Sequence, residues 1–211
     1  MALLNPTPPQ AVTAAVQDGL RTLIAGQIAH KYYVGGPPGI PSPADVGFVG
    51  GTPPVGHNPQ QVFVLGLSGL ATALGTASAR PDGWRLFAGN SQGKTVLCRV
   101  VERPPGRWRL TGCSWGDQVW NALQTSQRIG VFSAVQQGNY ELRVLTIPGL
   151  NLETFWLVAQ TPAADDLVVP YQANQSILRE SQSGPIQMAT FLSVIGPMVT
   201  KRMSAPKPAI S

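Results

Sequence analysis

Residues Thr95 to Gly112 read TVLCRVVERPPGRWRLTG, two runs of alternating apolar and polar residues around Pro104-Pro105-Gly106. Such alternation is typical of strands, because successive side chains of a strand point to opposite faces. A three-residue connection that ends in Gly matches a type I turn followed by a left-handed residue. The stretch therefore predicts a bulged β-hairpin with strands over 95–102 and 107–112.

The register of this hairpin determines which side chains share a face. One face carries the apolar side chains of Val96, Cys98, Val100, Trp108 and Leu110. The other face carries Arg99, Arg107 and Arg109. In this register Cys98 and Cys113 alternate onto opposite faces, so we expect no disulfide between them without a register shift.

Further strands and helices are predicted on both sides of the hairpin. The other runs rich in β-branched and aromatic residues are 61–67, 84–88, 140–147, 152–159 and 167–170. Helical spacing and capping signals predict an amphipathic helix from Pro9 to His30, a short helix from Ser114 to about Gln127, and a helix opened by Ser183 that Pro197 ends or kinks. The fold class is α+β: an antiparallel sheet of about six strands in two meanders, with amphipathic helices near both termini.

Segment 34–59 is roughly half Gly and Pro. Pro removes hydrogen-bond donors and Gly raises the entropy cost of ordering, so we expect neither a helix nor a central strand here. The apolar Ile40, Phe48 and Val55 favour an ordered arm that contacts its own domain or a neighbouring subunit, with a flexible loop as the alternative. We predict a single α+β domain over 1–203 that includes this arm, and a disordered tail over 204–211.

Charged residues are sparse, at 12% of the 211 residues, and the net charge is +5. Because weakly charged surfaces associate readily, we expect the protein to belong to an assembly. The N-terminus lacks a secretory signal, no apolar run reaches the roughly 20 residues that span a bilayer, and Cys98 and Cys113 are the chain's two cysteines. These features predict a cytoplasmic protein without a membrane span. A mature chain whose signal has been removed is the alternative.

Residues 88–95, AGNSQGKT, resemble a relaxed P-loop in which Ala replaces the first Gly. Gly93, Lys94 and Thr95 would then contact phosphate and magnesium. A P-loop needs a helix N-terminus directly behind it, whereas the residues after Thr95 have the composition of a strand. We therefore predict a hairpin turn and no cofactor, with a nucleotide-binding protein or enzyme as an alternative.

A second alternative is nucleic-acid binding through the basic hairpin, where Arg103 joins the three arginines named above. No catalytic or metal-ligating residues are predicted, because the chain's two imidazoles, His30 and His57, lack the spacing of a triad or a metal site. The favoured function is a non-enzymatic structural or protein-interaction subunit in a homo-oligomer or larger complex, with itself or other subunits as partners. Its predicted partner contacts are Ile40, Phe48, Val55, Arg99, Arg103, Arg107 and Arg109.

Overall fold

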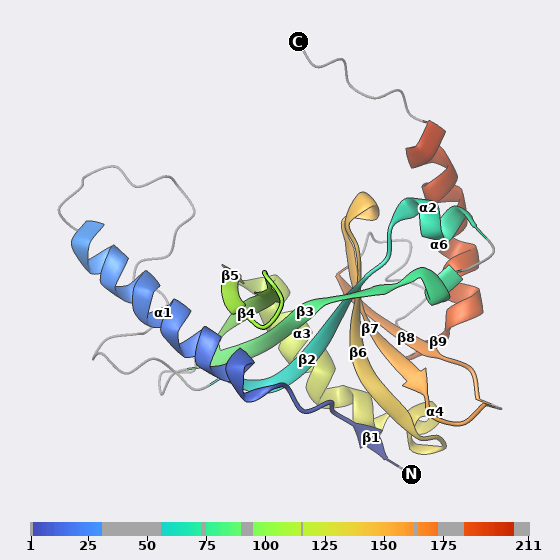
Figure 1. Ribbon diagram of the computed structural model, residues 1–211. Helices are drawn as coiled ribbons and strands as arrows, with labels where there is room; N and C mark the ends of the chain where they lie inside the picture. The colour runs from blue at the N-terminus through green and yellow to red at the C-terminus, as the bar shows by residue number, and fades with distance from the viewer. Residues whose placement is uncertain are drawn as a thin grey trace. The chain divides into compact units, whose positions relative to one another are not determined.

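A computed structural model describes residues 2–30, 56–72, 75–89, 95–114, 116–162, 164–172 and 184–204 (Figure 1). The chain divides into two compact units. Unit 1 comprises Met1–Asn5, Gln61–Asp82 and Gln124–Ser211, and unit 2 comprises Pro6–Gln60 and Gly83–Leu123. Each unit is thus assembled from separate stretches of the chain.

The described strands are β1 (Leu3–Leu4), β2 (Gly56–Val64), β3 (Arg80–Gly89), β4 (Thr95–Glu102), β5 (Trp108–Ser114), β6 (Tyr140–Ile147), β7 (Leu152–Ala159), β8 (Leu167–Gln172) and β9 (Ile186–Gln187). They form a nine-stranded sheet in the order β5-β4-β3-β2-β6-β7-β8-β9, with β1 also paired to β6. β1 and β2 run parallel to β6, whereas the pairs β3–β4, β4–β5, β6–β7, β7–β8 and β8–β9 are antiparallel.

The described helices are α1 (Gln10–His30), α2 (Leu67–Ala71), α3 (Asp117–Arg128), α4 (Ser133–Gln136) and α6 (Met188–Ser204). Short 3₁₀ turns occupy Gly75–Ser78, Ile129–Val131 and Pro148–Leu150. α6 continues past Pro197 rather than ending there, and Ser204, assigned to the predicted tail, is its last residue. Residues 205–211 of that tail lie outside the described residues.

The α+β class and the mostly antiparallel sheet are confirmed, but about six strands was an undercount, since the sheet has nine. β1 and β9 have two residues each, too few to show a period in the sequence. The parallel pairing of β1 and β2 with β6 joins segments far apart in the chain. Local sequence patterns carry no signal for such a pairing.

The predicted arm over 34–59 is wrong at its C-terminal end, because residues 56–59 are the start of β2. The pairing of β2 with β6 begins at Gln61, so the missing N–H of Pro59 removes no bond from that pairing. The rest of the segment, with Ile40, Phe48 and Val55, lies outside the described residues.

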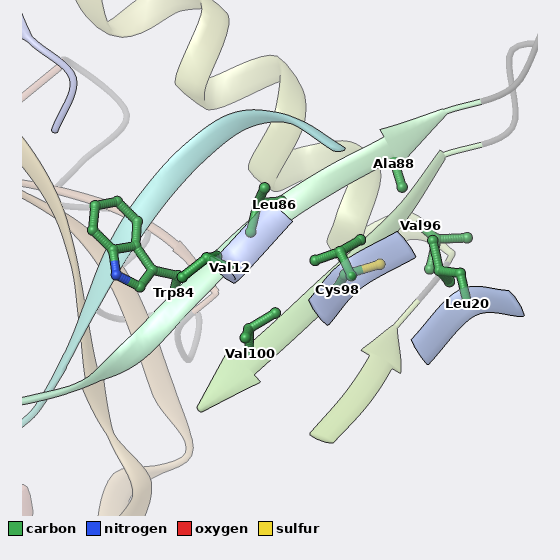
Figure 2. Packing of buried hydrophobic residues seen from close by; sticks show 9 residues of the cluster. Val12, Leu20, Trp84, Leu86, Ala88, Val96, Cys98 and Val100 are labelled. Atoms are coloured by element: carbon green, nitrogen blue, oxygen red, sulfur yellow. The ribbon is translucent and has the colours of Figure 1, made fainter. Parts of the chain in front are cut away.

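The core of unit 2 lies between α1 and the strands β3 and β4 (Figure 2). Val12, Val16 and Leu20 recur at intervals of four along α1, so they form one stripe, and all three are buried. They pack against the side chains of Trp84, Leu86, Ala88, Val96, Cys98 and Val100. This arrangement confirms the predicted amphipathic N-terminal helix and the predicted apolar face of the hairpin.

The hairpin departs from its predicted register at a bulge in β5. Gly112 and Leu110 oppose the consecutive residues Arg99 and Val100, which leaves Thr111 as the extra residue. One extra residue sends every later side chain to the other face of the sheet. Cys113 is therefore the direct partner of Cys98 and packs against the same apolar cluster, so the prediction that the two cysteines lie on opposite faces is wrong.

The core of unit 1 lies between α6 and one face of the strands around β7. Phe191 and Ile195, four residues apart on α6, are fully buried against apolar side chains of β2, β6, β7 and β8. α2 lies beside α6 (Figure 1). Asn151 ends the turn between β6 and β7 in the left-handed conformation, at φ 49°, which Asn tolerates better than most residues.

Candidate functional site

The P-loop-like segment is described only at its ends. Gly93 and Lys94 lie outside the described residues, and Thr95 is the half-buried first residue of β4. A strand therefore follows Thr95, where a P-loop would place the N-terminus of a helix behind the phosphates. The nucleotide-binding alternative gains no support from this geometry.

The arginines predicted as partner contacts differ in exposure. Arg103, Arg107 and Arg109 are exposed, and Arg99 is half-buried opposite Arg85 of β3. The backbone N–H of Arg103 donates to the Arg107 carbonyl oxygen at 2.8 Å, and the N–H of Gly106 donates to the Glu102 carboxylate at 2.7 Å. These bonds give the turn a defined shape, with Gly106 in the left-handed region at φ 80°, as predicted.

The hairpin presents its positive charge on a surface strand. Among the described strands, β5 pairs with β4 alone and ends the hydrogen-bonded order of the sheet. None of the three exposed arginines forms an ion pair with a described residue. Trp108 does not join them, because it packs with the apolar cluster under α1.

Arg85 follows the apolar Trp84 in a strand, so its side chain points to the opposite face, where a charged residue is normally exposed. In the structure Arg85 is nevertheless buried. It is 3% exposed, and its Nε donates to the Oε1 of Gln60 at 2.7 Å. Gln60 is fully buried as well. Arg85 therefore belongs to the interior of unit 2 and not to a basic surface patch.

Cys98 and Cys113 form a pair that the sequence analysis missed. Their Sγ atoms lie 3.9 Å apart, with Cys98 buried and Cys113 partly exposed. The hydrogen bond with Cys113, together with burial, raises the pKa of the Cys98 thiol, and the same hydrogen bond lowers the pKa of Cys113. Gly112 inside a strand pattern was the available signal, because an isolated Gly there indicates a bulge.

Several polar side chains of unit 1 form hydrogen bonds or ion pairs within its strands and their connections. Asp166 accepts hydrogen bonds from Trp156 Nε1 at 2.8 Å and from the backbone N–H of Ala159 at 2.9 Å. Arg143 pairs with Glu141 at 2.7 Å and lies over the ring of Phe63. Across the described ranges, no cluster of three or more His, Cys, Asp or Glu side chains could hold a metal ion.

A hollow of about 220 Å³ opens between α2 and α6. Its lining is largely aliphatic, with Leu70, Leu192 and Val199 among its walls, Thr72 as a polar member and Gly196 leaving room on α6. No titratable side chain lines it, so the hollow offers no group for acid–base chemistry.

None of the helices that the structure describes has the length and apolar character required to cross a bilayer.

The hairpin of β4 and β5 thus combines an exposed basic edge, which could bind a partner, with a close thiol pair, which could react. No protein-family model, curated protein or solved structure matches this chain.

Proposed function

We propose that the protein is a non-enzymatic interaction subunit, and that the outer edge of β5 receives an extended segment of a partner protein. The observation that carries this proposal is the one-sided pairing of β5 among the described strands. The outward N–H and C=O groups of such a strand can pair with a further strand, which is a common mode of peptide recognition.

The charge beside this edge selects the partner. Arg103, Arg107 and Arg109 are exposed at the turn and on β5. An acidic segment would neutralise them, whereas a second copy of the same edge would add more positive charge. We therefore favour an acidic partner within a larger complex over pairing between two copies of this edge.

Nucleic acid is the second candidate, since the same arginines could contact phosphates. Single-stranded nucleic acid usually also requires exposed aromatic side chains on which bases stack. Trp108, the aromatic residue of the hairpin, packs under α1 instead. This packing favours a protein partner.

The test measures binding of labelled probes to the full chain by fluorescence anisotropy. The probes are an acidic peptide in which Glu alternates with Val and Thr, a matched peptide with Lys in place of Glu, and a single-stranded oligonucleotide. The variant is R107E/R109E, and the control is R202E, a reversal of an exposed charge on α6 of unit 1.

We expect the acidic peptide to bind, the Lys peptide not to bind, and binding to weaken with added salt. R107E/R109E should lose this binding and R202E should retain it. Tighter binding of the oligonucleotide than of the peptide, lost in the same variant, would replace the proposal by nucleic-acid binding. If neither the acidic peptide nor the oligonucleotide binds, both the protein-partner and the nucleic-acid hypotheses are wrong.

A further inference from the structure

The bulge at Thr111 brings two thiols together that a regular hairpin would separate. Direct partners in an antiparallel pair have Cα atoms about 4.5–5.5 Å apart, within the range of about 4.4–6.8 Å seen in disulfides. Cys98 and Cys113 are such partners, and their Sγ atoms already lie 3.9 Å apart. We propose that Cys98 and Cys113 form a reversible dithiol–disulfide pair that exchanges electrons with small disulfides of the glutathione type.

The two thiols are unequal in access to solvent. Cys98 is 0% exposed, between Val96 and Val100 on the side of β4 that faces α1 (Figure 2). Cys113 lies on β5, at the end of the described sheet order, and is partly exposed. An external disulfide therefore meets Cys113 first, and Cys98 is the second thiol to react.

The hydrogen bond between the sulfur atoms supports the same order of reaction, with Cys113 before Cys98. It lowers the pKa of Cys113, which increases the fraction of thiolate at the accessible position. It also raises the pKa of Cys98, so Cys98 keeps its proton until Cys113 has reacted. The thiolate is the nucleophile in thiol–disulfide exchange.

The exchange proceeds in two balanced steps. The Cys113 thiolate attacks one sulfur of an oxidised glutathione molecule, forms a mixed disulfide, and releases one glutathione thiolate. Cys98 then loses its proton and attacks the Cys113 sulfur, which breaks the mixed disulfide and releases the second glutathione. Both protein thiols are oxidised by one electron each, and one glutathione disulfide is reduced to two thiols.

The apolar surroundings suit this sequence of steps. Val96, Val100 and Leu110 pack around the pair and shield Cys98 from solvent. This shielding protects Cys98 from direct attack by an external reagent, while Cys113 stays accessible to that reagent. Intramolecular closure is then faster than a second encounter with glutathione, because the two sulfur atoms are held close together.

The test uses the full chain equilibrated over a series of reduced-to-oxidised glutathione ratios. Samples are quenched with acid, free thiols are alkylated, and peptides are identified by mass spectrometry without reduction. C98S should hold glutathione on Cys113 as a stable mixed disulfide, and C113S should acquire little glutathione on Cys98. In the reduced native protein, Cys113 should be alkylated on the order of tenfold faster than Cys98.

We expect the native protein to lose two hydrogens and to yield a peptide in which Cys98 is linked to Cys113, with full reversal by reduced glutathione. Retention of two free thiols in excess oxidised glutathione would overturn the proposal. Crosslinks between different chains only, or faster alkylation of Cys98, would overturn it as well. The native protein decides these outcomes even if a serine variant fails to fold.

Discussion

Replacing Gly19 by Ala sets helix propensity against packing in α1. Gly19 lies in the interior of this helix, where Ala is favoured over Gly by about 1 kcal/mol. A Cβ at this position would contact Leu110 of β5, lying 2.6 Å from its Cδ2, 3.0 Å from its Cγ, and also against its Cβ. Because Leu110 Cβ is fixed to the backbone of β5, the helix and the strand must move apart.

Overpacking of this kind costs about 1–3 kcal/mol, so the free energy of unfolding of G19A should fall by about 1 kcal/mol despite the gain in propensity. Gly130 provides the control, because a Cβ there meets nothing within 4 Å. Removing its backbone freedom should raise the free energy of unfolding by about 0.4–1 kcal/mol. The difference between the two variants measures the packing cost.

The assay is urea unfolding followed by circular dichroism, for G19A, G130A, L110A and the double variant G19A/L110A. In the L110A background the contacts with Cδ2 and Cγ are gone and only the contact with Cβ remains, so Gly19→Ala should be less destabilising than it is in the native protein. If G19A alone stabilises the protein as much as G130A does, the close approach of α1 to β5 is refuted.

Three further predictions concern other parts of the molecule. Cys98→Ala removes the hydrogen bond that lowers the pKa of Cys113, so the pH midpoint of Cys113 alkylation should rise; an unchanged midpoint would contradict this cause. Phe191→Ala should reduce the free energy of unfolding by about 3–5 kcal/mol in urea, because its ring is fully buried under α6; a loss below about 1 kcal/mol would contradict that burial. Asp166→Asn should cost about 1–3 kcal/mol in the same assay, because the charged acceptor of Trp156 Nε1 and of the Ala159 N–H is lost; wild-type stability would show that these bonds are dispensable.

The elements with a strong local pattern were predictable from the sequence. The stripe of Val12, Val16 and Leu20 indicated α1, and alternation indicated β4 with the bounds that the structure has. Both patterns follow from which face of an element is buried, and that face repeats with the period of the backbone. The left-handed Gly106 was equally local, because the turn required it.

The candidate site depends on features that leave no periodic pattern in the sequence. The extra residue Thr111 moves Cys113 to the face of Cys98, and alternation carried across the bulge assigned it to the wrong face. The burial of Arg85 depends on Gln60, a residue from another strand of unit 2. The bulge had a local signal in Gly112, whereas the contact that buries Arg85 joins separate segments of the chain and leaves no local pattern.

The division of the sequence between the units bears on the order in which the protein can fold during synthesis. Unit 2 requires residues up to Leu123, while unit 1 uses residues on both sides of it and draws on residues up to Ser211. β1, near the start of the chain, pairs with β6, and the backbone N–H of Ala2 donates to Asn139 across 137 positions. β1 is therefore synthesised long before its partner β6, which is the kind of long-range closure that slows folding.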